Sequence, residues 1–77
     1  MMRAFAYLVN DCSEYHIMCG EEYSSTSNLE VALDCAIGVS LSKGKIAYIL
    51  CDGSENRKYL YRVYAESNNE FYVRQLN

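Results

Sequence analysis

Apolar residues occur along the chain in short runs separated by polar clusters, a pattern typical of strands joined by turns. The first run, residues 3–9, is apolar at both odd and even positions, which favours a strand that is covered on both sides or lies centrally in a sheet. A weaker strand is predicted from Tyr15 to Cys19 and ends at Gly20. The polar run from Glu21 to Asn28 is interpreted as a loop.

The clearest pattern is helical. Ser27 precedes Glu30 by three positions, the spacing of a capping box in which the serine oxygen caps the first-turn amides and the glutamate reaches back to the cap. Gly44 provides a C-terminal stop. We predict a helix from Asn28 to Ser42, in which Gly38 allows close approach to a strand. The residues at helical spacing are Leu29, Ala32, Leu33, Ala36, Ile37 and Ser40.

Three strand-like runs follow the predicted helix, from Lys45 to Cys51, from Lys58 to Ala65 and from Glu70 to Leu76. Residues 52–54 and 67–69 separate them with suitable turn chemistry, so the three runs should form an antiparallel meander. The predicted fold is α+β, a four- or five-stranded antiparallel sheet with one helix packed on one face. In chain order this gives one or two strands, the helix and three more strands, in a single domain spanning residues 1–77.

A single helix covers only one face of a sheet, so the side chains on the other face become candidates for binding. One set of alternating positions is assigned to the core: Ile46, Tyr48, Leu50, Tyr59, Tyr61, Val63, Ala65, Phe71 and Val73. The other set is expected to face solvent: Lys58, Leu60, Arg62, Tyr64, Tyr72, Arg74 and Leu76.

The predicted solvent-facing set combines tyrosine with basic residues, and tyrosine and arginine are common at binding hot spots. We take Lys58, Arg62, Tyr64, Tyr72 and Arg74 as the candidate binding residues of this sheet face. The same pattern is also explained by a stabilising cross-strand tyrosine pair flanked by arginine stems. The two interpretations are compatible.

Charge is unevenly distributed along the chain, whose net charge is −3. Residues 1–38 carry one basic and six acidic residues, a net charge of −5, and residues 39–77 carry six basic and four acidic residues, a net charge of +2. Such polarity steers association with a partner of matching charge. Glu14, Glu21 and Glu22 therefore form a second candidate surface, an acidic loop. A net charge of −3 is weak for a mimic of nucleic acid.

The sequence shows no catalytic motif, and we expect neither an enzyme nor a cofactor. A Cys12–His16 dyad is disfavoured because the neighbouring Asp11 and Glu14 oppose a thiolate. The spacing of Cys12, His16 and Cys19 differs from that of zinc knuckles, so no metal site is expected.

The expected compartment is the cytoplasm. The first apolar run is too short to span a membrane and lacks the features of a signal peptide. In a reducing cytoplasm the four cysteines should remain thiols.

The layout of an MMRAFAYLV strand, a variable loop, an STSNLEVALDCAIGVSLSKG helix and three closing strands resembles small phage-encoded anti-CRISPR inhibitors of type I systems. The resemblance spans most of the chain and lies in architecture and size, with no shared residue motif. It implies stoichiometric blocking of a multi-subunit CRISPR surveillance complex, by covering lysines of that complex that would hold guide or target nucleic acid. No functional residue can be carried over.

Two functional hypotheses follow. The first is an inhibitor or adaptor that binds a protein through the basic and aromatic sheet face or the acidic loop. The alternative is a module that binds single-stranded nucleic acid, with bases stacked on the tyrosines and phosphates held by the arginines. An exposed strand from Glu70 to Leu76 could also pair with a second copy to form a homodimer.

Overall fold

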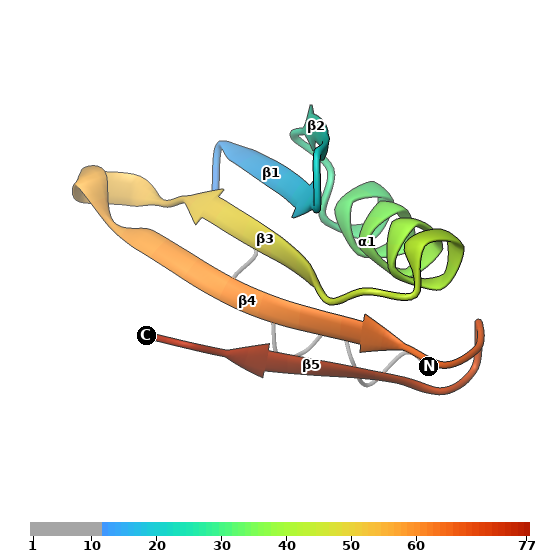
Figure 1. Cartoon of the computed structure of the whole chain (residues 1–77). Coiled ribbons are helices and arrows are strands. Elements are labelled where there is room, and N and C mark those ends of the chain that lie inside the picture. Colours follow the sequence, from blue (N-terminus) through green and yellow to red (C-terminus); the bar gives the residue numbers. More distant parts are fainter. Residues whose placement is uncertain (1–11) are drawn as a thin grey trace.

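The computed structural model describes residues 12–77, so the strand predicted at residues 3–9 lies outside the described residues. Within this range the chain forms five strands, one α-helix and one short 3₁₀ helix (Figure 1). In chain order they are β1 (Glu14–Cys19), β2 (Glu22–Thr26), α1 (Leu29–Lys43), β3 (Ala47–Asp52), η2 (Ser54–Asn56), β4 (Lys58–Ala65) and β5 (Phe71–Gln75).

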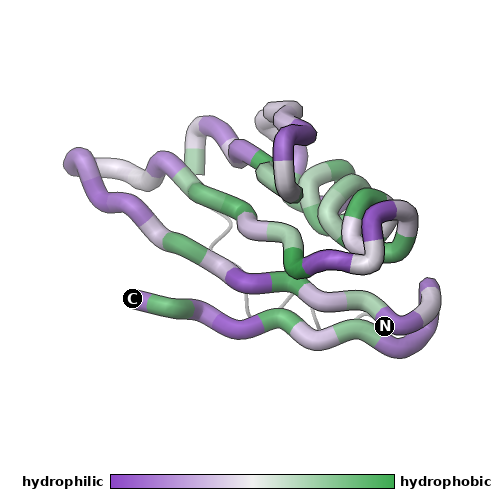
Figure 2. Tube along the Cα trace, in the orientation of Figure 1, coloured by the Kyte–Doolittle hydropathy of each residue, from purple (hydrophilic) through white to green (hydrophobic). Residues whose placement is uncertain are grey.

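The strands form one antiparallel sheet in the order β2-β1-β3-β4-β5, and α1 packs against it. This arrangement confirms the predicted α+β fold and the β3-β4-β5 meander. Figure 2 shows that hydrophilic residues gather at the connections between β3 and β4 and between β4 and β5, where the strands leave the sheet. No helix within residues 12–77 is long and apolar enough to cross a membrane.

One strand was missed because its sequence is polar. The run from Glu21 to Asn28 was predicted as a loop, but β2 occupies Glu22–Thr26 and pairs with β1. Its residues are exposed or half-buried, so the strand has few apolar side chains and shows no strand pattern in the sequence. Backbone hydrogen bonds to β1 hold it in the sheet. The predicted strand from Tyr15 to Cys19 is confirmed as part of β1.

The helix begins one residue later than the predicted capping box requires. Asn28, rather than Ser27, is the N-cap, and its side chain accepts a hydrogen bond from the Val31 amide. Gly44 ends the helix in the left-handed region with φ of 65°, as predicted. Gly38 is exposed with open space around it, so the predicted close approach to a strand is wrong.

The core lies between α1 and one face of the sheet. The prediction that Ile46, Tyr48 and Leu50 point into this core is wrong. Ala47, Ile49 and Cys51 are the buried positions, whereas Tyr48 is 37% exposed on the other face. The β3–β4 register explains this, because Ile49 lies opposite Tyr61, which is fully buried, and opposed residues share a face. Small Ala47 and Cys51 also let the helix lie close to the central strand. The predicted core positions of β4 and β5 are confirmed as buried or half-buried.

A buried serine ties the helix to the sheet. Ser40 is fully buried in α1, its hydroxyl donates to the Lys45 carbonyl at 2.7 Å, and the same oxygen accepts from the Ala65 amide at 3.0 Å. One hydroxyl therefore provides hydrogen-bond partners for two backbone groups, the amide at the end of β4 and the carbonyl in the turn after α1.

Candidate binding surface on the open face of the sheet

We use the term open face for the sheet face opposite α1, over which no other described element packs. Exposed apolar side chains concentrate there. Of the six large hydrophobic residues exposed within residues 12–77, Val31 belongs to α1 and the other five lie on the open face: Tyr23, Tyr48, Tyr64, Tyr72 and Leu76. Tyr23 and Tyr72 are more than 60% exposed. Contiguous exposed aromatic surface is a feature of interaction sites.

A hollow of about 360 Å³ opens on the part of the open face that β4 and β5 form, and we call it the groove. It is lined by Ile46, Arg62, Tyr64, Tyr72 and Arg74. The register places Arg62 opposite Arg74 and Tyr64 opposite Tyr72, so two cross-strand pairs form its walls. Four of the five sheet-face residues predicted to bind are thus brought together.

The two groove arginines are an energetic conflict. Arg62 and Arg74 are directly opposed on neighbouring strands, where like charges destabilise a sheet. Within residues 12–77 neither guanidinium forms an ion pair or a hydrogen bond. Arg57, in contrast, lies 3.9 Å from Glu55. The groove therefore presents two adjacent cations that no acidic side chain of this part of the chain neutralises.

Lys58, the fifth predicted residue, lies at the other end of β4 and belongs to a different group. Its ammonium donates to Oδ1 of Asp52, the residue opposite it on β3. Lys58 and Tyr64 are six positions apart in the strand, a distance of roughly 20 Å. Lys58 therefore contributes nothing to the groove.

A polar network surrounds Asp52. His16 Nε2–H donates to Asp52 Oδ2 at 3.0 Å, because an ionised carboxylate only accepts. In the neutral ring the other nitrogen, Nδ1, then accepts from the Tyr23 hydroxyl at 2.6 Å, and the two rings stack. Lys58 and then His16, by hydrogen bonding to the carboxylate, hold the pKa of Asp52 below its usual range.

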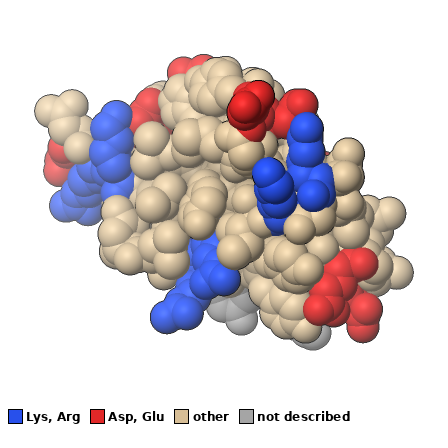
Figure 3. Space-filling model, viewed as in Figure 1, with Lys and Arg blue, Asp and Glu red and all other residues tan. Residues whose placement is uncertain are grey.

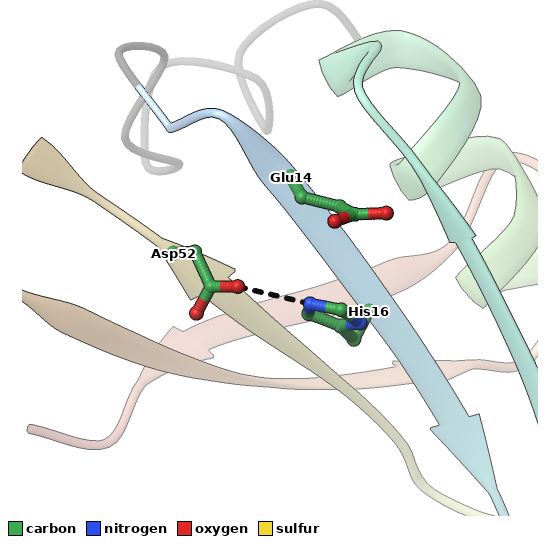
Figure 4. Close-up of side chains that lie close together, drawn as sticks. All are labelled: Glu14, His16 and Asp52. Atoms are coloured by element: carbon green, nitrogen blue, oxygen red, sulfur yellow. Dashed lines mark hydrogen bonds and ion pairs between the residues drawn. The ribbon is translucent and has the colours of Figure 1, made fainter.

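Glu14 joins this network from the strand position opposite Asp52. One ligand atom from each of Glu14, His16 and Asp52 lies within 4.8 Å of the others, and Figure 4 shows the three side chains on the same side of β1 and β3. These residues could hold a metal ion. Sequence reasoning missed this cluster because it did not recognise β2 or the β1–β3 pairing; the single histidine was the available signal.

The metal and catalytic combinations considered from sequence are not assembled. His16 and Cys19 are three positions apart in β1 and so lie on opposite faces, with Cys19 buried in the core. Cys12 packs against the same core, away from His16. Burial raises the pKa of the Cys51 thiol to about 12, with the neighbouring Cys12 adding to the shift, so this thiol stays protonated. Burial raises the pKa of Tyr15 to about 12 as well.

The acidic loop predicted as a second surface is divided by the structure. Glu14 begins β1, whereas Glu21 lies in the turn beyond the other end of that strand and Glu22 begins β2. Glu22 already faces Lys43 at 3.4 Å. These three carboxylates therefore do not form one docking patch.

Comparison with known proteins finds no match among protein-family models, curated proteins or solved structures. The resemblance to anti-CRISPR inhibitors stays a prediction, and functional inference depends on the geometry of the open face.

Proposed function

We propose that the protein is a non-enzymatic binding protein that docks onto a protein partner through the groove, which receives an acidic segment of that partner. The observation that carries the proposal is the opposed Arg62–Arg74 pair, which has no ion-pair partner within residues 12–77. Proteins tolerate such a local conflict mainly at functional sites.

The groove matches a carboxylate flanked by apolar side chains. A guanidinium binds a carboxylate through two parallel hydrogen bonds, and two guanidinium groups side by side favour one or two carboxylates strongly. The tyrosine rings and Ile46 provide apolar walls, and the tyrosine hydroxyl groups, which make no hydrogen bond to another residue within 12–77, can form directional bonds with a partner. Rigid aromatic anchors beside arginine are typical of protein-binding hot spots.

Single-stranded nucleic acid is the second candidate, because the same tyrosines could stack bases. The charge of the open face favours a protein instead. Three basic residues, Lys58, Arg62 and Arg74, share this face with Glu14 and Asp52, and Lys58 is already paired. Figure 3 shows lysine and arginine in separate groups on the one side of the molecule that it displays.

The most specific form of the proposal is an inhibitor that blocks a host defence complex in the cytoplasm, as the anti-CRISPR resemblance implies. The groove then contacts an acidic patch of a complex subunit rather than its nucleic-acid-binding lysines. A homodimer paired through β5, the last strand in the sheet order, is a competing assembly, and sedimentation of the purified protein tests it.

The proposal is tested with a fluorescein-labelled extended peptide that alternates glutamate with leucine, compared with the same peptide carrying glutamine. We expect saturable binding of the glutamate peptide only, with the largest amide NMR shifts at Arg62, Tyr64, Tyr72 and Arg74. Arg62→Glu/Arg74→Glu should abolish binding. The matched control Arg57→Glu/Lys45→Glu makes the same charge change at exposed sites outside the groove and should bind nearly as well.

Two results would contradict the proposal. Equal loss of binding in the groove variant and in the control would mean that only overall charge matters. Tighter binding of an oligothymidine than of the peptide, with affinity that falls steeply as salt is raised, would favour the nucleic-acid alternative.

A further inference from the structure

We propose that Glu14, His16 and Asp52 form a zinc-binding site that joins β1 to β3 on the open face. The three side chains supply one imidazole nitrogen and two carboxylates, a donor set that zinc accepts with water completing the coordination. The inference is independent of the groove and of its partner.

The geometry is close to that of a bound ion. Two atoms that each lie about 2.1 Å from one zinc ion at the tetrahedral angle are about 3.4 Å apart. His16 Nε2 and Asp52 Oδ2 are 3.0 Å apart, and no pair of ligand atoms in the cluster is separated by more than 4.8 Å. The Glu14 side chain is exposed, so it has room to rotate toward the other two ligands.

The strands hold the ligands in place. Glu14 and His16 are two residues apart in β1 and therefore point to the same face, and Asp52 lies opposite Glu14 on β3. Two ligands thus come from one strand and the third from its hydrogen-bonded neighbour. The backbone ladder fixes the spacing before any ion binds, which lowers the cost of assembling the site.

Tyr23 supplies the outer support that metal-bound histidines usually have. When zinc replaces the proton on His16 Nε2, the ring takes a proton on Nδ1, which donates to the Tyr23 oxygen that now lies 2.6 Å away. The proton displaced from Nε2 is thus held on Nδ1. Stacking of the two rings keeps Nε2 directed at the carboxylates.

Lys58 is the internal competitor of the metal. Its ammonium occupies Asp52 Oδ1 and leaves Oδ2 for the ion. Because Lys58 repels a cation, removing its charge should tighten metal binding, whereas removing a ligand should weaken it. Loss of His16, which carries no negative charge, separates a coordination site from a cluster of acids that attracts cations by charge alone.

The test is a titration with zinc chloride by calorimetry, in a Cys12→Ser/Cys35→Ser background that removes the two partly exposed thiols. We expect one ion per chain and shifts of the His16 ring signals, which are unambiguous because the chain has one histidine. His16→Gln should weaken binding about 100-fold and Tyr23→Phe about tenfold. Lys58→Met should bind more tightly. The unfolding temperature of the parent should rise with zinc concentration.

Glu14→Gln and Glu66→Gln form a matched pair, because both remove one exposed carboxylate and only Glu14 lies in the cluster. Weaker binding in Glu14→Gln alone supports the site. Equal weakening in both variants, unmoved His16 signals, or binding by His16→Gln as tight as the parent overturns it.

Discussion

The face of the sheet that α1 covers and the open face are made of alternate residues of the same strands, yet they differ in charge, exposure and hydrogen bonding. Within residues 12–77, the side chains buried between the helix and the sheet are uncharged, and Ser40, the one polar residue among them, has its hydrogen bonds satisfied. The open face carries exposed tyrosines, an opposed arginine pair and the Asp52 network. The contrast fits the proposal that one face stabilises the fold and the other binds a partner, one residue apart along each strand.

The largest expected difference between the two faces is in stability, and two neighbouring residues of β3 test it. Ile49 is fully buried beneath α1, and Leu50 is half-buried on the open face. Ile49→Ala should lower the free energy of unfolding by about 2–5 kcal/mol, because it removes packed atoms and leaves a cavity. Leu50→Ala should cost about 1 kcal/mol. Urea unfolding followed by circular dichroism measures both.

A domain this small has little stability to lose, so Ile49→Ala could unfold outright. Ile49→Val then provides the measurement, with an expected cost of about 0.5–1.5 kcal/mol. Equal costs for the two alanine variants would break the comparison, because the open face would then be as important for stability as the covered one.

The sequence predicted the elements whose signals are local. The glycine stop of α1, the strand at Lys58–Ala65 and the meander depend on spacing within a few residues, and the structure confirms them. β2 and the orientation of β3 depend on pairing with distant residues. Residues 46–51 are apolar at both parities, so only the register with β4 decides which side faces the helix.

The second test concerns the one polar side chain buried among the core residues. Ser40→Ala should cost about 1–3 kcal/mol, because the buried Ala65 amide loses its acceptor. Ser42→Ala is the matched control on an exposed position of α1 and should change stability by less than about 0.5 kcal/mol. Hydrogen exchange of the Ala65 amide, measured by NMR, should accelerate in Ser40→Ala only.

The candidate sites were predictable only where their residues lie close together in the sequence. Arg62 with Tyr64 and Tyr72 with Arg74 lie on adjacent strands joined by a short turn, so alternation alone placed them together. The Glu14, His16 and Asp52 cluster joins positions 38 residues apart and needs the β1–β3 register, which no local pattern encodes. The Cys12 and Cys19 alternatives failed because sequence proximity does not determine the face.

The smallest expected effect is a gain in stability, opposite in sign to the losses expected on the covered face. This difference in sign distinguishes the two faces most clearly. Substitutions on the covered face should destabilise the fold, whereas Arg74→Gln removes one of two opposed like charges. We expect a gain of about 0.2–1 kcal/mol in the free energy of unfolding at low salt. The gain should shrink as salt screens the repulsion.

Arg57→Gln is the control for the loss of one positive charge, since Arg57 faces Glu55 across an exposed ion pair and should lose little or nothing. Arg62→Gln/Arg74→Gln should be no more stable than either single variant, because the repulsion disappears with the first substitution. A loss of stability in Arg74→Gln would mean that the guanidinium stem packs against the sheet more than its charge repels. The arginine pair would then be a structural feature of the open face, and the argument that its unneutralised charge marks a docking site would fail.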